Sequence, residues 1–184
     1  FTNEECAFGY RNSVFKNKLK GKFVITNVTF KLSKIAHNLN TSYGAISTLL
    51  SSVANPTIKD VANAVIHIRT RKLPDPKEIG NSGSFFKNPV VKSNFFALLK
   101  KNYSEIPHYI LSENEIKIPA GWLIEQCGFK GKRFGDAGVH AKQALVLVNY
   151  KNASGIEIYN LAKKIQSAVA EKFAISLEFE VNIV

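Results

Sequence analysis

The sequence predicts an α+β fold, a mix of antiparallel strands and helices. Three stretches of the chain support this prediction. Ser154-x-x-Glu157 is a capping-box sequence, and apolar residues at helical spacing follow it as far as Phe173. From Ile175 to Ile183 apolar and polar residues alternate, which is the period of a strand with one buried face. A second run, Phe23 to Leu32, alternates in the same way and is rich in β-branched residues.

Composition limits the class of protein. The chain has 184 residues, 45% of them apolar, which suits one domain or one domain with part of another. It contains no apolar run of 18 residues and no charged-then-apolar signal at its start, so we expect a cytoplasmic protein. Cys6 and Cys127 lie far apart and form neither a disulfide nor a metal pattern, which fits a reducing compartment.

The formal net charge of +11 favours an anionic partner. Nucleic acid, a membrane surface and a phosphorylated small molecule all have the required charge. The lysines are scattered, however, and no basic helix is interleaved with aromatic residues. We therefore expect a diphosphate ligand, with nucleic acid as the second choice and no membrane partner.

The first 60 residues contain few regular elements. Residues 1–16 are polar and aromatic, residues 18–22 read as a solvated turn, and residues 33–41 as a polar connection after the strand at 23–32. A weak helical stretch extends from Ser42 to about Val53. Because the chain contains no methionine and opens abruptly, we expect it to begin inside a longer protein.

A clearer helix begins near Thr57, whose spacing to Asp60 resembles a capping box. Its apolar face is given by residues at i, i+3, i+4 and i+7: Val61, Ala64, Val65 and Ile68. The two prolines of Leu73-Pro74-Asp75-Pro76 end this helix and impose an extended turn.

The second half alternates short elements. We expect a helix at 93–101, a hairpin of 109–111 with 115–118, and a short helix from Pro119 through Cys127. A loop rich in glycine and lysine extends from there to Gly138, and residues 143–148 form a buried strand. The four histidines are dispersed, and no two are at metal-ligand spacing.

The chain is organised around Gly80-Asn81-Ser82-Gly83-Ser84-Phe85-Phe86-Lys87-Asn88-Pro89. Gly80 and Gly83 permit positive φ and let a ligand approach the backbone closely. Ser84 offers a hydroxyl at the end of the turn, and Lys87 and Asn88 add a cation and an amide. Taken alone, the segment is more typical of a glycine-rich loop leading into a strand than of a binding site, because lone glycine motifs are weak signals.

This string closely resembles the G-x-x-GSFFKNP signature of the UDP-N-acetylenolpyruvoylglucosamine reductase family. Four further segments, in the family's order, are similar to its motifs. They are Cys6-Ala7-Phe8-Gly9-Tyr10-Arg11-Asn12-Ser13-Val14-Phe15-Lys16, Arg69-Thr70-Arg71-Lys72-Leu73-Pro74-Asp75-Pro76, Ala120-Gly121-Trp122-Leu123-Ile124-Glu125-Gln126-Cys127-Gly128 and Leu177-Glu178-Phe179-Glu180-Val181. The resemblance extends from about residue 6 to 183.

The resemblance implies three catalytic residues. Ser84 matches the serine that donates a proton to the substrate, and Arg11 matches the arginine that contacts the enolpyruvyl carboxylate and steadies the enol. The family's glutamate corresponds to Glu178, the first Glu of its terminal LEPEV, and we expect it in a partly dry pocket with Glu180 nearer the edge of that pocket. Residues alone leave Glu178 and Glu180 nearly symmetric, since both lie on the polar face of the last predicted strand. Phe179 stands where the family usually has proline.

The resemblance also implies the binding residues. Lys72, Tyr43, Asn88 and Gln143 match residues that hold the substrate, with the Tyr43 segment resembling the tyrosine-bearing loop of the type I branch. Tyr10 and Gly83 are expected to lie against the cofactor. No metal site is expected.

The chemistry implied is the reduction of UDP-N-acetylglucosamine enolpyruvate to UDP-N-acetylmuramate in peptidoglycan precursor synthesis. NADPH reduces FAD, the reduced flavin gives hydride to the β-carbon of the enolpyruvyl ether, and Ser84 protonates the α-carbon. Most of the family's FAD-binding region precedes the segment at 6–16, so we expect the chain alone to be inactive and to lack the main FAD cradle. We expect a monomer.

The implied organisation has three parts. Residues 1–35 would be the end of an FAD-binding domain of the vanillyl-alcohol-oxidase type, residues 36–71 a connecting helical segment with the Tyr43 loop, and residues 72–184 the α+β substrate domain. Two other classes remain open. One is a non-catalytic module that binds a nucleotide sugar, and the less favoured one is a basic RNA-binding domain.

Overall fold

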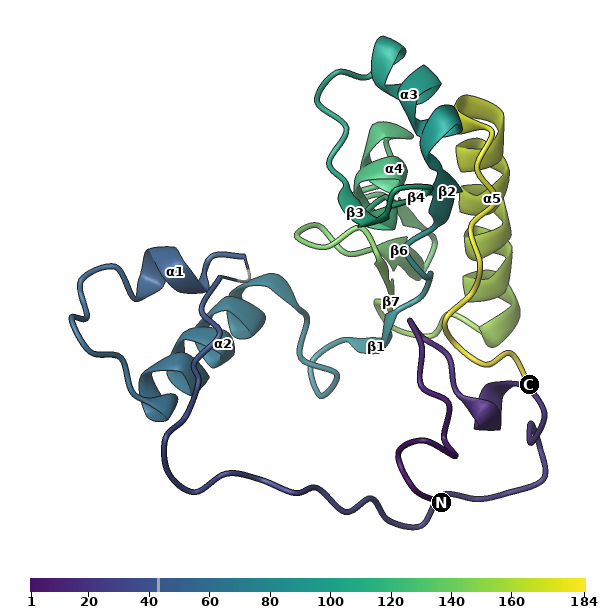
Figure 1. Ribbon diagram of the computed structural model, residues 1–184. Coiled ribbons are helices and arrows are strands. Elements are labelled where there is room, and N and C mark those ends of the chain that lie inside the picture. The colour runs from purple at the N-terminus through teal and green to yellow at the C-terminus, as the bar shows by residue number, and fades with distance from the viewer. Residues whose placement is uncertain (43) are drawn as a thin grey trace. The chain divides into compact units, whose positions relative to one another are not determined.

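The computed structural model describes residues 1–42 and 44–184, so the expected substrate contact Tyr43 lies outside the described residues. The chain divides into two compact units, Phe1–Thr41 and Ser42–Val184, which are considered separately. Helices and short antiparallel strands both occur in the second unit, which confirms the predicted α+β class (Figure 1).

The first unit contains one short regular element among its described residues, the 3-10 helix η1 (Val14–Lys16). The strand predicted at 23–32 is absent, and that prediction is wrong. Val24, Phe30 and Leu32 are exposed rather than packed on one face. The β-branched pattern expresses a local preference only, whereas a strand also requires a partner for its ladder of hydrogen bonds.

The second unit opens with two helices, α1 (Ile46–Leu49) and α2 (Ile58–Lys72). The weak helix predicted at 42–53 is thus reduced to a single turn. The capping box of α2 is confirmed, because the backbone N of Asp60 donates to Thr57 Oγ1 and the Asp60 carboxylate accepts from the Thr57 backbone. The helix ends before the double proline, as predicted.

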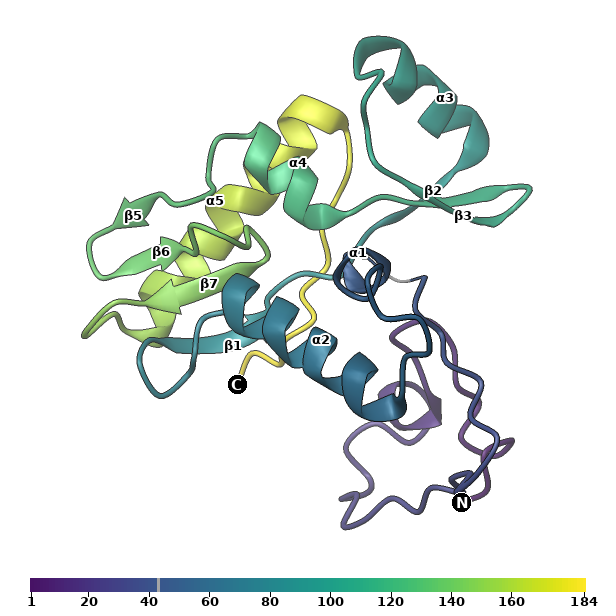
Figure 2. The same ribbon diagram turned by 90° about the vertical axis from the view of Figure 1, so that its left-hand side faces the viewer.

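A four-stranded antiparallel sheet has the order β1-β7-β6-β5. Its strands are β1 (Gly80–Ser84), β5 (Arg133–Phe134), β6 (Ala137–Val139) and β7 (Val146–Asn149). The helix α5 (Gly155–Phe173) crosses behind this sheet in Figure 2. Both sides of the predicted capping box of α5 are present, at Ser154 and Glu157.

A smaller sheet of order β2-β4-β3 joins β2 (Val90–Lys92), β3 (Tyr109–Ser112) and β4 (Glu115–Lys117). The predicted hairpin is β3 with β4. Helix α3 (Ser93–Asn102) follows β2, and α4 (Ala120–Gln126) follows β4 and packs on α5. Pro119 is the N-cap of α4 rather than its first helical residue.

The core lies between α5, α4 and the four-stranded sheet. The apolar face of α5 is buried as its spacing predicts, with Ile165 and Val169 fully enclosed. Burying a side chain of this size removes it from water at a gain of about 1.5–3 kcal/mol. The sheet positioned by this core includes the Ser84 segment.

The prediction of a strand at 175–183 is wrong, although buried and exposed side chains still alternate over part of the segment. Ile175 and Leu177 are buried, but Ile183 is 53% exposed. The segment pairs through one isolated antiparallel bridge, Phe86 with Phe179, so it lacks the continuous ladder of a sheet strand.

Among the described residues, none of the helices has both the length and the apolar character that spanning a membrane requires.

Candidate functional site

The second unit has three hollows of interest, and of the predicted site residues that the structure describes only Gly83, Asn88 and Gln143 line any of them. We name the one beside Gly83 the turn hollow, with a volume of about 740 Å³. The end of α2, the proline turn, the Asn81–Gly83 segment and the residues before β7 form it. Its charged lining is Arg69, Arg71, Asp75, Glu78 and Lys142, with His140 beside them. Lys72, the last residue of α2, is exposed next to this lining but is not part of it.

The glycine-rich segment forms an edge strand, β1, rather than the loop expected from its composition. Its pairing with β7 is irregular between Asn81 and Ser84, where Gly83 has a φ of +72°. The Asn81 carboxamide oxygen accepts from the Gly83 backbone N at 3.0 Å and holds this bulge. A Cβ at Gly83 would meet nothing within 4 Å, so the backbone there is open to a ligand.

Ser84 ends β1, half-buried and opposite Val146 of β7. The next residue anchors it, because the Phe85 backbone N donates to the Leu145 carbonyl at 2.8 Å and the Phe85 ring is buried. The serine hydroxyl is therefore attached to a rigid part of the sheet, beside the open backbone of Gly83.

A second hollow of about 300 Å³, named the amide hollow, contains the expected substrate contacts Asn88 and Gln143 together. Both side chains already have structural partners. The Asn88 Oδ1 accepts from the Ala120 backbone N at 2.8 Å, where α4 begins. The Gln143 Oε1 accepts weakly from the Leu145 backbone N at 3.4 Å. Their positions are thereby held before any ligand arrives.

Lys142 lines both the turn hollow and the amide hollow. The two hollows are therefore neighbours on either side of the Lys142 side chain. Lys130 and the aromatic rings of Tyr109 and Trp122 also line the amide hollow. Cations beside aromatic faces suit a phosphorylated ligand that contains a planar ring.

The carboxylate expected in the site is arranged differently from our prediction. We expected Glu178 in a partly dry pocket, but its side chain is 73% exposed and forms an ion pair with Lys87 at 2.8 Å. Glu180 is half-buried, and its backbone N donates to the Phe85 carbonyl at 2.9 Å. The expected order of burial is thus reversed, because the bridge at Phe179 aligns Glu178 with Lys87 and Glu180 with Phe85.

Arg11 and Tyr10 occupy the centre of a tight turn in the first unit. The backbones of Gly9 and Asn12 exchange two hydrogen bonds, at 3.0 and 3.1 Å. Arg11 adopts a φ of +53°, a left-handed conformation that costs a residue with a Cβ about 1–2 kcal/mol. Such strain is common where a side chain is displayed for function. Both side chains are exposed within this unit.

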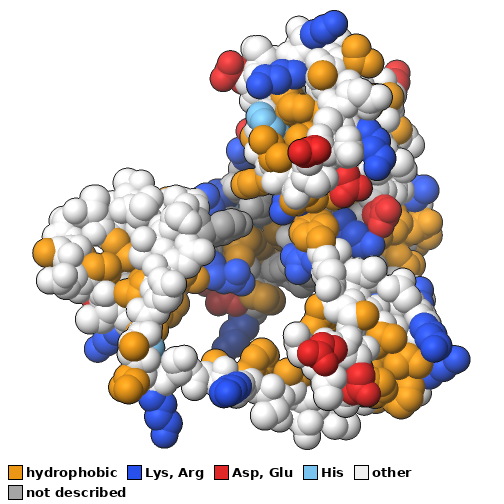
Figure 3. Space-filling model, viewed as in Figure 1, with side chains coloured by type: hydrophobic (Ala, Val, Ile, Leu, Met, Phe, Trp, Pro, Cys, Tyr) orange, Lys and Arg blue, Asp and Glu red, His pale blue; other side chains and the backbone are white. Residues whose placement is uncertain are grey.

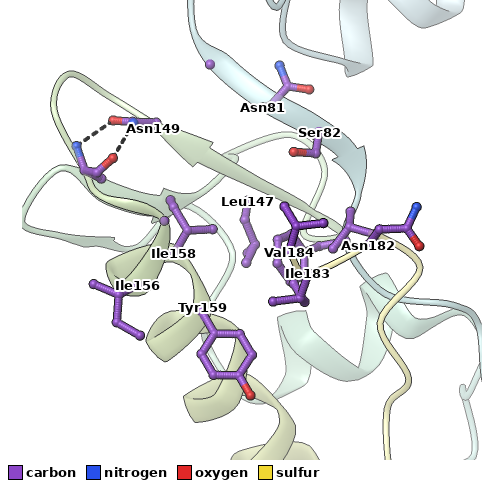
Figure 4. Close-up of a pocket in the computed structure, with 15 residues that line it drawn as sticks. Asn81, Ser82, Leu147, Asn149, Ile156, Ile158, Tyr159, Asn182, Ile183 and Val184 are labelled. Carbon is purple, nitrogen blue, oxygen red and sulfur yellow. Dashed lines mark hydrogen bonds between the residues drawn. The ribbon is translucent and has the colours of Figure 1, made fainter.

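The third hollow, about 770 Å³, lies between the start of α5, the strands β1 and β7, and the end of the chain (Figure 4). Its lining is largely apolar and includes Leu147, Ile158, Tyr159 and Ile183. None of the residues predicted for catalysis or substrate binding lines it.

His140 is the only histidine among the described residues that lines the turn hollow. Burial of the ring, and to a smaller extent the nearby ammonium of Lys142, lowers its pKa from the ordinary value of 6.5. The imidazole is therefore neutral near neutral pH. The sequence analysis did not select His140, because the four histidines are dispersed along the chain. The signal that could have selected it is its position three residues before Gln143.

A metal centre and a nucleic-acid surface both lack support. The described residues contain no group of three His, Cys, Asp or Glu side chains that could hold a metal ion. On the face shown in Figure 3, Lys and Arg side chains are scattered among acidic and apolar ones and form no stripe. This distribution does not favour the RNA-binding alternative.

Comparisons with known proteins match the sequence of this chain to one family. The family model described as UDP-N-acetylenolpyruvoylglucosamine reductase, C-terminal domain, matches residues 75–184. A reductase of that name from Flavobacterium johnsoniae is 59% identical over all of this chain and 55% of its own length. One from Amoebophilus asiaticus is 50% identical over the same shares. The chain thus spans about half the length of these curated relatives.

A solved structure of the Thermus caldophilus reductase of the same name covers 68% of this chain and 33% of its own. Its sequence identity is 23% and its TM-score is 0.41, a likeness too weak to carry an argument.

Proposed function

The chain belongs to the UDP-N-acetylenolpyruvoylglucosamine reductase family, and we propose that it forms the substrate-binding, proton-donating part of such a reductase. The reaction proposed is the NADPH-dependent reduction of UDP-N-acetylglucosamine enolpyruvate to UDP-N-acetylmuramate. The observation that carries the proposal is the Ser84 segment. A hydroxyl on a rigid strand follows an open glycine backbone at the edge of a hollow whose lining includes Arg69, Arg71 and Lys142 as well as two carboxylates.

Ser84 is the proposed proton donor. A serine hydroxyl is a weak acid, so it serves only a strongly basic carbon and only when it is held in position. The carbon left after hydride addition to an enolpyruvyl group meets the first demand. The bonds that anchor Phe85 meet the second.

Arg11 is the proposed partner of the substrate carboxylate. A guanidinium group presents two parallel N–H donors, which match the two oxygens of a carboxylate. The turn between Gly9 and Asn12 displays this side chain at the cost of a strained backbone, which supports a role in binding.

Glu178 is the proposed carboxylate that steadies the enol, on the basis of the family motif. Its side chain is 73% exposed and forms an ion pair with Lys87, so it differs from the partly dry carboxylate that we expected. Glu180 is half-buried, but its backbone pairs with Phe85 rather than with Ser84. Electrostatic stabilisation is strongest where water is excluded, so the proposed role requires bound substrate to cover the Glu178 carboxylate.

The UDP part of the substrate is proposed to lie along the adjoining hollows. Asn88, Gln143 and Lys142 are already assembled there, and Lys72 lies at the end of α2 beside the turn hollow. Tyr43 stays a proposed contact on the basis of the sequence resemblance alone.

FAD is the cofactor that the family resemblance implies, with NADPH as the co-substrate. The open space at Gly83 and the size of the turn hollow fit a planar ligand near Ser84. When bound, the flavin supplies the hydride. Gly83 would let the ring approach the backbone, and Tyr10 stays a proposed cofactor contact on the basis of the sequence resemblance alone. The proposed setting is the cytoplasm, and the proposed assembly is a monomer.

The test is an assay of the complete protein that carries this chain. NADPH oxidation should depend on added UDP-N-acetylglucosamine enolpyruvate and should yield UDP-N-acetylmuramate. A protein that binds the nucleotide sugar but never oxidises NADPH would instead be the non-catalytic module.

A further inference from the structure

His140 lines the turn hollow and has an unsatisfied buried polar atom. Its Nδ1 is buried and has no hydrogen-bond partner among the described residues. Buried polar atoms are nearly always paired in folded proteins, and an exception calls for a missing partner. The ring lies in the lining shared with Gly83, Arg69 and Lys142, so a ligand in that hollow is the natural partner.

The sheet places His140 on the same side as Ser84. Ser84 of β1 is opposite Val146 of β7, and the backbone N of His140 donates to the Val146 carbonyl at 2.9 Å from the other edge. The β6–β7 register, which pairs Val139 with Leu147, continues to His140 and Val146. Residues directly opposite in an antiparallel ladder share a face, so Ser84, Val146 and His140 face the same way.

The spacing suits a shared ligand. Neighbouring strands lie about 4.8 Å apart, which puts the backbones of Ser84 and His140 roughly 10 Å from each other. Val146, buried between them, is part of the floor of the hollow. A small-molecule group resting on Val146 would reach the serine hydroxyl on one side and the imidazole on the other.

We propose that His140 is a substrate-binding residue whose Nδ1 hydrogen-bonds the same enolpyruvyl sugar that Ser84 protonates. This inference rests on the proposed function and adds a contact to it. The imidazole is neutral at neutral pH, as its lowered pKa indicates, so it acts as a hydrogen-bonding group rather than a cation. Its role is to hold the sugar in position, and it transfers no proton.

The experiment compares His140→Leu with His140→Asn in the complete protein. The leucine variant removes the hydrogen bond, whereas the asparagine amide restores a polar atom near the position of Nδ1. The dissociation constant for UDP-N-acetylglucosamine enolpyruvate is measured by titration of the flavin absorbance. His140→Leu should weaken binding about 5- to 10-fold, the scale of one neutral hydrogen bond. His140→Asn should stay within about 3-fold of the wild type on the same scale.

His108→Leu is the matched control, since the His108 Nδ1 already contacts the Ile106 carbonyl and the residue lines neither the turn hollow nor the amide hollow. Flavin content and melting temperature report folding in every variant. If the wild type turns the substrate over and His140→Leu binds it as tightly, this inference fails while the proposed function stands. Equal weakening in the asparagine and leucine variants would make His140 structural and also overturn the inference. A wild type that neither binds nor reduces the substrate would overturn both the proposed function and this inference.

Discussion

Lys87 contacts Glu178 through both its backbone and its side chain. The Lys87 backbone N donates to the Glu178 carbonyl at 2.9 Å, and its Nζ lies 2.8 Å from the Glu178 carboxylate. Together with the bridge between Phe86 and Phe179, these contacts join the Ser84 segment to the end of the chain. The pair engages the carboxylate that the sequence motif selects and leaves Glu180 beside the buried ring of Phe85.

The first prediction separates the two glutamates. Because the family motif selects Glu178, Glu178→Gln should lower turnover of the complete protein on the order of 100-fold, the scale of one positioned electrostatic group. Glu180→Gln should lower it less than about 5-fold, since Glu180 pairs with Phe85 through its backbone and the substitution keeps that contact. Steady-state kinetics with circular dichroism to check folding would decide. The reverse order would move the role to Glu180.

The second prediction concerns Arg11. Arg11→Lys keeps the charge but loses the planar pair of donors, so kcat/KM for the enolpyruvyl substrate should fall about 100-fold. Arg133→Lys is the control, since Arg133 forms an ion pair with Asp136 and lines none of the three hollows described above. Arg11→Lys at wild-type activity would remove Arg11 from the site.

The third prediction tests the start of α5. Ser154 accepts from the Glu157 backbone N, and losing such an N-cap costs about 1 kcal/mol. Ser154→Ala should lower the free energy of unfolding by that amount in urea denaturation. Ser167→Ala, an exposed position within the same helix, should leave it nearly unchanged. Equal effects of the two substitutions would mean that the cap contributes nothing.

The fourth prediction follows from the same cap. Hydrogen bonds from the Ser154 side chain, and then from its backbone, lower the pKa of Glu157 from its ordinary value of 4.5. A carboxyl whose folded pKa is depressed stabilises the fold above its unfolded pKa, and this contribution is lost as pH falls through the folded pKa. The melting temperature should therefore drop below pH 4.5 more steeply in the wild type than in Ser154→Ala. If the melting temperatures of the wild type and Ser154→Ala fell in parallel as the pH is lowered, the link between this cap and the pKa of Glu157 would be contradicted.

Local signals predicted the two long helices and the hairpin of β3 with β4, but they failed for two of the predicted strands. The capping boxes at Thr57 and Ser154 carry their own hydrogen bonds, so α2 and α5 begin where their sequences predict. Strand pairing depends on distant segments. The alternating run at 23–32 therefore forms no strand, while the glycine-rich residues 80–84 become β1 because β7 is available beside them.

The candidate site, like the fold, could be predicted from the sequence only in part. Motif resemblance selected Asn88 and Gln143, and the fold brings both to one hollow from positions 55 residues apart in the chain. It could not predict which glutamate is buried, because that depends on how Phe179 pairs with Phe86. His140 likewise required the register across three strands before its relation to Ser84 was visible.

The central claim is that Ser84 donates a proton after hydride has left the flavin. Stopped-flow absorbance of the complete protein follows flavin reduction by NADPH and flavin reoxidation by the enolpyruvyl substrate separately. Ser84→Ala should leave reduction within about 2-fold of the wild type and slow reoxidation by at least about 100-fold, the contribution of a positioned general acid. Ser167→Ala, at an exposed serine of α5 that lines none of the three hollows, should change neither step. Collapse of flavin reduction in Ser84→Ala, or reoxidation at the wild-type rate, would contradict the claim.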